Sequence, residues 1–333
     1  DEWSGGAMYY LRDGLGAKKN CKWIGKILAV LFCIFTMLAS FGIGSMGQVN
    51  KIVTNVAAAF DVSALSSIEV FSGVSLYNII LGAVVMALVA LITLGGLKRI
   101  ASVAEKIVPF MVVLFVAGSL VIIGINYDAI IPAFKAIFVN AFKPEAFVGG
   151  GIGGVILAMT NGFKRGVFSN EAGLGSSVMV HSSSNVKEPV KQGLWGIFEV
   201  FFDTMVVCTM TALIALTSGM INLDTGVVNK DVNDATLISK AFGGVFGQAG
   251  EWFIAIAMLM FAFTTVLGWS QYGSKAVEYL FGVKGVKVYK VIFVLMIVSG
   301  ALMTSSLAWD ISDTFNGLMM IPNLIAVLIL SPL

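Results

Sequence analysis

The chain has 333 residues, and its 21 Lys and Arg plus 19 Asp and Glu residues leave only 12% of it charged. A soluble domain carries about 25% charged residues, whereas 58% of this chain is hydrophobic and its mean hydropathy is +0.93. This composition excludes a cytosolic enzyme and predicts a protein whose apolar surface is solvated by lipid. The formal net charge of +2 is too small to indicate a nucleic-acid partner.

The sequence has few residues for catalysis or for holding a resident metal. Its three cysteines, Cys21, Cys33 and Cys208, are far apart, so neither a disulfide framework nor a metal site is indicated. The single histidine, His181, is predicted to lie in a cytoplasmic loop, far from any activating partner. The run GGGIGG at 149–154 matches the spelling of a dinucleotide-binding loop, but it opens an apolar helix without a βαβ unit and is attributed to helix packing. We therefore expect neither an enzyme nor a cofactor.

Apolar segments recur along the chain at the length that a bilayer requires, because a hydrocarbon core of about 30 Å needs roughly 20 residues of helix. Residues 1–333 are predicted to form a single all-α transmembrane domain, a polytopic helical bundle. Most Lys and Arg residues fall on the side of the N-terminal tail, so the tail is predicted to be cytoplasmic. The eight expected spans are about 23–46, 77–97, 107–125, 148–184, 190–219, 248–281, 288–308 and 314–333.

The first span ends in FGIGSMGQVN, where small residues allow close helix packing beside Gln48. Gln48 is a candidate for binding a ligand amine or carboxylate. An interhelical hydrogen bond is the simpler interpretation and is favoured from the residues alone.

The fourth span is interrupted by the polar, glycine-rich run NGFKRGVFSNEAGLGSS at 161–177, which predicts a broken helix. A break at membrane depth exposes N–H and C=O groups, and these are tolerated only beside a cavity or a polar ligand. We expect a second half-helix to begin near Asn170, with N–H groups suited to a carboxylate. Asn170 as a simple helix cap is an equally good explanation. Glu171 is expected to pair with Arg165, as a structural ion pair or a gate.

The fifth span carries Glu199 and Asp203 four residues apart on one helical face. Two carboxylates in a medium of low dielectric rarely both ionise, so one of them is a possible proton site. Equally, both can face a polar cavity or a neighbouring helix.

The sixth span contains adjacent hydroxyl groups at Thr264 and Thr265. Threonine in a membrane helix commonly bonds back to its own carbonyl groups, and spacing alone favours that interpretation. The alternative is part of an oxygen cage for a monovalent cation. Trp269, one turn beyond Thr265, either packs in the bundle or forms the wall of an apolar pocket.

Several long motifs resemble the signature sequences of the alanine/glycine:cation symporter family. They are MYYLRDGLG (8–16), GQVN (47–50), KRGVFSNEAGLGSS (164–177), EPVKQGLWGIFEVFFDTMVVCTMTAL (188–213), TTVLGWSQYGSKAVEYLFG (264–282) and DTFNGLMMIPNLIAVLILSP (313–332). The resemblance covers essentially the whole chain. It implies the amino-acid/cation transporter fold of two inverted five-helix repeats, in which the first helix of each repeat is broken. The eight spans then correspond to the third to tenth helices, so we expect a fragment that lacks the first two helices and is truncated at both ends.

The resemblance also implies functions for the candidate residues. The implied sodium ligands are Thr264 and Thr265. The implied substrate contacts are Gln48, Asn170 and Trp269, with Phe168 and Ser169 as weaker candidates.

The activity that the resemblance implies is secondary active transport. We expect sodium-coupled symport of a small neutral amino acid, alanine or glycine, into the cell across the plasma (inner) membrane. Sodium would be the co-transported ion, and the lipid bilayer the surrounding partner. Two alternatives remain open, namely proton-coupled symport through Glu199 or Asp203, and an ion channel. The shortage of catalytic residues disfavours a membrane enzyme.

Overall fold

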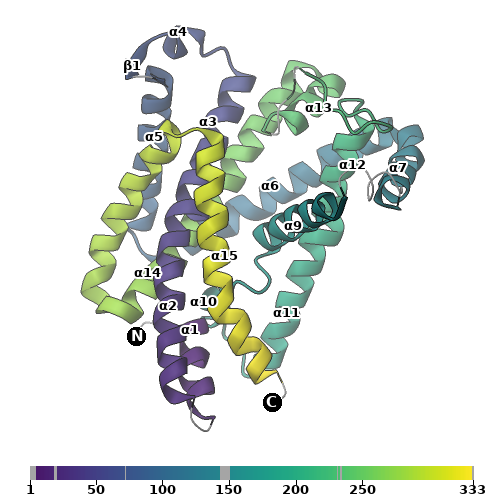
Figure 1. Cartoon of the computed structure of the whole chain (residues 1–333). Coiled ribbons are helices and arrows are strands. Elements are labelled where there is room, and N and C mark those ends of the chain that lie inside the picture. Colours follow the sequence, from purple (N-terminus) through teal and green to yellow (C-terminus); the bar gives the residue numbers. More distant parts are fainter. Residues whose placement is uncertain are drawn as a thin grey trace.

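The structure is a computed structural model that describes residues 5–18, 21–71, 73–142, 151–230, 232 and 235–331. It is an elongated helical bundle (Figure 1), which confirms the expected all-α polytopic class. Within the described residues a single short sheet forms, in which β1 (Glu69–Phe71) pairs antiparallel with β2 (Val74–Ser75). Glu69 lies opposite Ser75 and Phe71 opposite Val74, with an irregularity in register between the two pairs.

The first long helical rod runs from Lys22 to Ala59. It follows α1 (Ala7–Tyr9) and the π-helical turn η1 (Tyr10–Gly14), and it consists of α2 (Lys22–Phe41), the π-helical turn η2 (Gly42–Met46) and α3 (Gly47–Ala59). The π turn coincides with the sequence GIGSM, where small residues let neighbouring helices approach the backbone.

Two further long helices follow the small sheet. Ser75 begins α5 as its N-cap, because its hydroxyl oxygen accepts the backbone N–H of Asn78 at 3.4 Å. The elements of this region are α4 (Ser63–Ser66), α5 (Leu76–Thr93), α6 (Leu97–Ile125), η3 (Tyr127–Ala129) and α7 (Ile130–Phe142).

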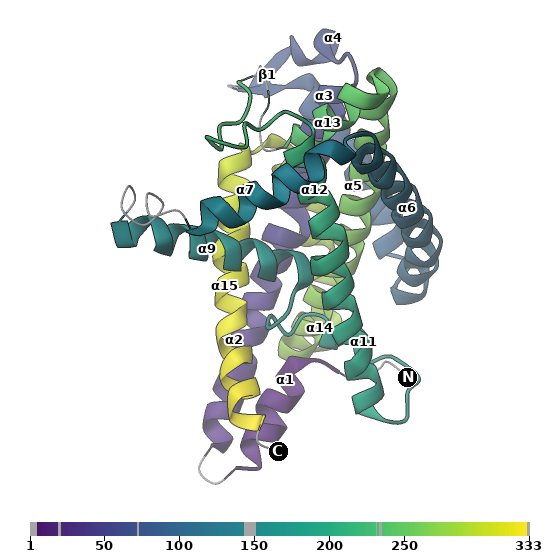
Figure 2. The ribbon, with the colours of Figure 1, turned by 90° about the vertical axis from the view of Figure 1, so that its right-hand side faces the viewer.

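The second half of the chain begins with a helix that stops inside the molecule. Its elements are α9 (Gly151–Asn170), α10 (Val178–His181), α11 (Pro189–Phe201), the π-helical η4 (Phe202–Cys208), α12 (Thr209–Thr217), α13 (Leu237–Phe246), α14 (Gln248–Leu302) and α15 (Ser305–Leu330). Gly282 divides α14 into two arms, since its backbone has φ 72° and ψ −179° in the middle of the helix. Figure 2 shows α7 and α9 running across the direction of α2 and α15.

Helix α14 lies at the centre of the bundle and packs against α2, α3, α5 and α13. One apolar cluster joins α3, α5 and both arms of α14 through residues such as Ile52, Val85 and Val266. A second cluster joins α1, α2, α14 and α15 around Trp269 and Phe32. These clusters fix the position of the first rod relative to α14.

The closest backbone approach lies at η2. A Cβ atom added at Gly44 would lie 2.3 Å from the Cβ atom of Trp269, and one added at Gly300 would lie 2.6 Å from the Cα atom of Met46. Glycine therefore lets both arms of α14 contact the first rod directly.

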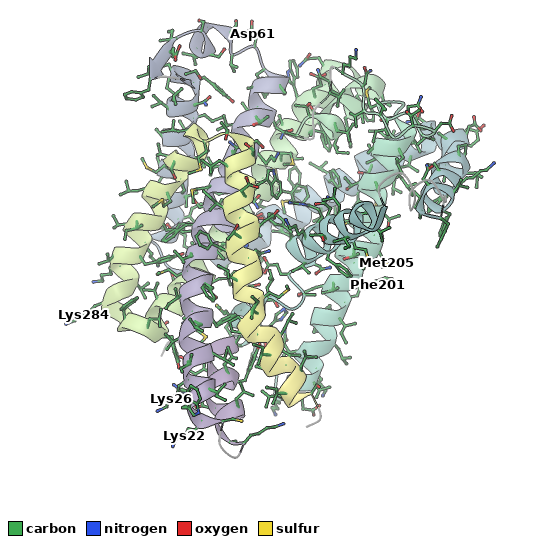
Figure 3. All side chains as sticks on the ribbon, viewed as in Figure 1. Lys22, Lys26, Asp61, Phe201, Met205 and Lys284 are labelled. Carbon is green, nitrogen blue, oxygen red and sulfur yellow. The ribbon has the colours of Figure 1, made fainter. Side chains whose placement is uncertain are left out.

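The outer surface is strongly apolar. Figure 3 labels Phe201 and Met205 on α11 and η4, and their side chains are 56% and 60% exposed. By length and composition, six helices of the described chain suffice to cross a membrane. They are Lys22–Ala59, Leu76–Thr93, Lys98–Ile125, Pro189–Thr217, Gln248–Leu302 and Ser305–Leu330.

Candidate functional site

The backbone departs from helical geometry over several residues after α9. Glu171 has φ 56° and, among the described residues, is the one non-glycine residue with a positive φ. Gly173 and Gly175 follow with φ 86° and 79°. The Asn170 side chain stabilises this turn, because its Oδ1 atom accepts the backbone N–H of Ala172 at 2.9 Å. The chain thus leaves the helical path at 171–177, inside the interrupted run.

The helix end at this break is a C-terminus, whereas an N-terminus was expected. Asn170 is the last residue of α9, and the next helix begins only at Val178 and has four residues. The prediction that a second half-helix begins near Asn170 is therefore wrong. The break presents the carbonyl end of α9, with its negative partial charge, where an N–H end was expected. Asparagine favours both kinds of helix end, so the residue type alone did not distinguish them.

Glu171 turns inward toward α14. Its carboxylate accepts a hydrogen bond of 2.5 Å from the Ser176 hydroxyl, and it lies within interaction range of the Trp269 and Tyr272 side chains. Trp269 is 1% exposed and contacts the Tyr272 ring edge-on at 5.2 Å. Among the described residues its indole N–H has no hydrogen-bond partner of normal geometry. The break and α14 therefore share a buried polar surface within an apolar cluster that includes Leu174.

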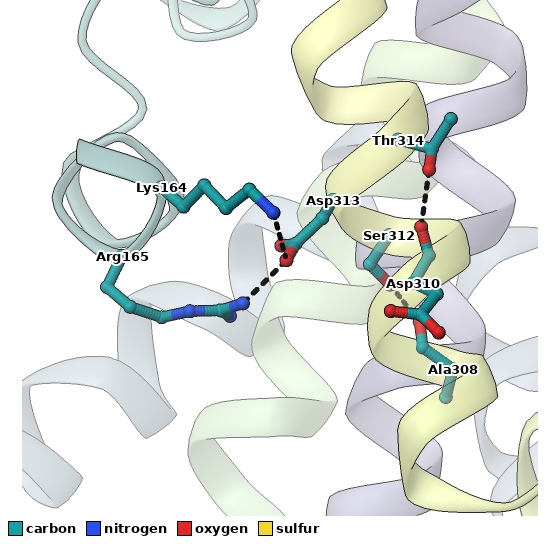
Figure 4. Close-up of polar contacts among 7 residues, drawn as sticks. All are labelled: Lys164, Arg165, Ala308, Asp310, Ser312, Asp313 and Thr314. Atoms are coloured by element: carbon teal, nitrogen blue, oxygen red, sulfur yellow. Dashed lines mark hydrogen bonds and ion pairs between the residues drawn. The ribbon is translucent and has the colours of Figure 1, made fainter. Parts of the chain in front are cut away.

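Arg165 does not pair with Glu171, which corrects the second expectation about this segment. Its Nη2 atom donates to Asp313 Oδ2 of α15 at 2.6 Å, and the Nζ atom of Lys164 lies 4.0 Å from the same oxygen (Figure 4). The Arg165 guanidinium also lies 4.2 Å from the ring centroid of Trp309. The ion pair thus joins α9 to α15.

Two residues of this contact, Asp313 and Trp309, were not among the predicted site residues. Phe168 completes the group, with its ring centroid 4.9 Å from that of Trp309. The expected last span began at 314, which placed Asp313 outside the membrane. An acidic residue at the border of an apolar span was the signal that would have identified it.

Ser169 and Asn170 contact the π-helical segment η4. The Ser169 hydroxyl donates to Asp203 Oδ2 at 2.7 Å, and the Asn170 amide donates to Thr204 Oγ1 at 3.0 Å. The end of α9 is therefore attached to the fifth predicted span by two polar contacts. Residues in a π turn do not follow the α-helical period, so the sequence did not predict this contact.

Glu199 and Asp203 have different partners. Glu199 Oε2 lies 3.1 Å from His181 Nε2, and the other ring nitrogen of His181 lies 2.6 Å from Gln192 Nε2. The expectation that His181 lies far from any activating partner is wrong. Because α11 folds back beside α10, residues 18 positions apart meet.

The candidate cation ligands lie one turn before Trp269 on α14. Thr264 Oγ1 donates to the carbonyl groups of Met260 and Phe261, both at 3.0 Å, and Thr265 Oγ1 donates to Phe261 at 2.9 Å. Their protons are thus engaged within the helix, while their oxygen lone pairs are left as acceptors.

Gln48 lies half-buried on α3, in the rod that contacts Trp269 through Gly44. Its side chain makes no hydrogen bond within the described part of the chain. The structure brings Phe168, Glu171 and Trp269 into one region, whereas Ser169 contacts η4 instead.

A model of the sodium:alanine symporter family matches residues 1–333. The chain belongs to this family. Members of the family are transporters rather than enzymes, and the expected family assignment is confirmed.

Individual relatives are similar along nearly the whole chain. The sodium/alanine symporter AgcS of Methanococcus maripaludis is 41% identical over 330 residues, which cover 99% of the chain and 67% of the relative. From Bacillus subtilis, the amino-acid carrier protein AlsT is 34% identical over 333 residues, covering 99% and 64%. The probable sodium/glutamine symporter GlnT of the same organism is 34% identical over 329 residues, covering 98% and 62%. The chain spans about two thirds of the length of the curated relatives it matches.

This member of the sodium:alanine symporter family offers neutral oxygen atoms for a cation. No group of three or more His, Cys, Asp or Glu side chains able to hold a metal occurs within its described residues. Hydroxyl and carbonyl oxygens of α14 and the end of α9 are the chemistry that suits a hard monovalent cation. The Glu171 carboxylate and the indole N–H of Trp269 add an acceptor and a donor in the same region.

Proposed function

We propose that this protein is a secondary active transporter that carries a small neutral amino acid, alanine or glycine, into the cell together with sodium. The observation that most supports this function is the helix break at 171–177, which lies against Trp269 in the interior of an apolar bundle. A broken backbone at such a place requires polar partners, and an amino-acid zwitterion supplies both kinds.

The substrate ammonium group is proposed to face the carbonyl end of α9 near Asn170, together with the Glu171 carboxylate. The substrate carboxylate is proposed to accept hydrogen bonds from the Trp269 indole and the Gln48 amide. Within the described residues neither donor has a hydrogen-bond partner of normal geometry, although the indole lies within interaction range of Glu171. The tight contact between Gly44 and Trp269 would limit the side chain that fits. Because one methyl group changes binding by only about 1–3 kcal/mol, glycine and alanine should both be accepted.

Sodium is proposed to bind the oxygen atoms of Thr264 and Thr265. These hydroxyl groups donate to carbonyl groups of their own helix, which orients lone pairs away from it. Movement of one sodium ion down the membrane potential contributes about 2.3 kcal/mol per 100 mV, which drives uptake.

Arg165 and Asp313 are proposed to form a gate. Their ion pair joins the broken helix to α15 at 2.6 Å, so motion of α9 away from α15 has to separate it. We further propose one transmembrane domain in the plasma (inner) membrane, with the N-terminal tail of this chain in the cytoplasm. The positions of Lys22 and Lys26, at the end of the bundle opposite Asp61 (Figure 3), support that orientation.

The proposed function is tested by uptake of radiolabelled alanine into proteoliposomes that contain the full-length protein. Uptake should saturate with alanine and should require an inward sodium gradient. Flux that does not saturate with alanine would instead identify a channel. Alanine accumulation that is indifferent to sodium contradicts sodium coupling.

Proton coupling is the second candidate, and the contacts of two carboxylates favour it. Glu199 contacts the His181 imidazole, and Asp203 accepts a hydrogen bond from Ser169 beside the break. Uptake without sodium that follows a pH gradient and is lost in Asp203→Asn would support this alternative.

A further inference from the structure

A cavity of about 280 Å³ with a mixed polar and apolar lining lies at the end of α3 near β2. One of its walls is the face of α3 formed by Asn50, Val53, Thr54 and Ala57, which follow the helical spacing i, i+3, i+4 and i+7. Gln48 lies two residues before Asn50, or about 200° around the helix, and so belongs to a different face. The cavity is therefore separate from the site proposed above.

The α3 side of this cavity offers hydrogen-bond acceptors. Asn50 is 6% exposed, and its amide nitrogen donates to the carbonyl oxygens of Met303 at 2.9 Å and Gly300 at 3.4 Å. These two contacts settle which side-chain atom is the nitrogen, so the Oδ1 atom is the one that has no partner among the described residues. A buried acceptor without a partner is costly, and a ligand donor would relieve that cost.

Two hydroxyl groups strengthen this acceptor character. Thr54 Oγ1 donates to the carbonyl oxygen of Asn50 at 2.9 Å, and Tyr77 OH donates to that of Val53 at 2.8 Å. Both protons are engaged with the backbone, so the two oxygens present lone pairs. Neutral acceptors around an orphaned amide oxygen suit a positively charged group with several N–H donors.

Ser305 and Asn78, which also line the cavity, have a different character. Ser305 Oγ accepts a hydrogen bond from the Lys51 ammonium group at 3.2 Å, which places a positive charge beside this wall. Asn78 Oδ1 accepts from Ser75 at 3.1 Å, so the amide protons of Asn78 are the part of that side chain able to serve a ligand. At Ser305, the Lys51 ammonium group disfavours a ligand ammonium group relative to a ligand carboxylate.

We propose that this cavity is a second binding site for a small zwitterionic amino acid. The ligand ammonium group binds the Asn50 amide oxygen, and the ligand carboxylate lies toward Ser305 and Asn78 near the Lys51 charge. The volume of about 280 Å³ lies just below the range of about 300–1,000 Å³ for ligand pockets, which favours a ligand with a short side chain. The proposal extends the proposed function, since its ligand belongs to the class proposed as substrate.

The test uses a reporter cysteine at the cavity and a matched control beside it. Ser66 lines the cavity and Ser67 does not, although both are exposed and follow each other in sequence. In full-length protein with its native cysteines replaced, Ser66→Cys and Ser67→Cys are each alkylated with a water-soluble maleimide, with and without L-alanine. At ten times the dissociation constant, alanine should slow labelling at position 66 by up to about tenfold. Labelling at position 67 should not change.

Additional variants separate the two sites. Protection at position 66 should persist in Gln48→Leu, which removes a proposed contact of the transport site, and should be lost in Asn50→Leu. If Asn50→Leu does not fold, Asn78→Leu on the other wall should weaken the protection. No protection by alanine, equal protection at positions 66 and 67, or its loss in Gln48→Leu would each overturn the proposal.

Small ions that carry only one of the two charges of an amino acid test whether the site binds a zwitterion. Methylammonium chloride and sodium acetate should each protect position 66 less well than alanine at equal concentration. Equal protection by methylammonium would identify a cation site, and equal protection by acetate an anion site, and either result overturns the zwitterion site. Failure of sodium-driven uptake with protection intact would refute only the proposed function, while uptake without protection would refute only this second site.

Discussion

Replacement of Gly44 by alanine is the most direct test of how the first rod meets α14. The added Cβ atom would lie 2.3 Å from Trp269 Cβ and 2.7 Å from its Cγ, where ordinary contact begins near 3.4 Å. The shortfall is about 1 Å against the buried aromatic side chain of Trp269. Overpacking of this kind costs about 1–3 kcal/mol, partly offset by the 0.5–1 kcal/mol or so that alanine gains over glycine in a helix.

Gly268→Ala provides the matched control. Gly268 precedes Trp269 on α14, and an added Cβ atom there meets nothing within 4 Å. The backbone term is common to both variants, so the difference in their free energies of unfolding isolates overpacking, at about 1–3 kcal/mol. Reversible unfolding of the purified protein in mixed micelles, followed by circular dichroism, measures this difference. Equal stability of Gly44→Ala and Gly268→Ala would show that η2 does not hold Trp269 by direct contact.

Three further substitutions test the gate, the cation ligands and the kink. Asp313→Asn removes the partner of Arg165, so alanine preloaded into proteoliposomes should leak out faster. An unchanged rate of alanine efflux would contradict the proposal that this ion pair is a gate. Thr265→Val keeps the shape but removes an oxygen ligand, so half-maximal uptake should need about tenfold more sodium, and an unaltered sodium titration excludes Thr265. Gly282→Ala places an alanine at a backbone φ of 72° and should lower the free energy of unfolding by about 1–3 kcal/mol. Gly317→Ala should not, because an added Cβ atom meets nothing within 4 Å there, as at Gly282, and its φ is not positive. Equal stability of the two variants would show that the kink is unstrained.

Composition and hydropathy predicted the helical class because lipid imposes it on any chain with so few charges. The position of the break could also be predicted, since the polar run and its four glycines interrupt an otherwise apolar segment. Sequence alone did not predict the direction of the helix at Asn170. An asparagine can end a helix or begin one, and the outcome depends on which backbone groups the neighbouring helices satisfy.

The partners of the charged residues were harder to predict for a different reason. Arg165 lies six positions from Glu171 and 148 positions from Asp313, yet the distant residue is its partner. Glu171 adopts φ 56° and turns toward Trp269, which removes it from the face of α9 that carries Arg165. Local spacing therefore favoured the wrong pair. The π turns η2 and η4 shift the helical register in the same unpredictable way, and both lie beside candidate residues.

The polar contacts of the segment 164–181 connect it to separate parts of the bundle. Arg165 binds α15, Ser169 binds η4, and His181 contacts α11. Each contact joins a polar or charged group of this segment to another helix, so a movement of α9 that breaks one contact leaves a group that needs a new partner. A co-transported ion or a zwitterion arriving at the break can supply such partners. In the proposed carrier, binding at the break is thereby coupled to the arrangement of three neighbouring elements, as a site that is exposed alternately requires.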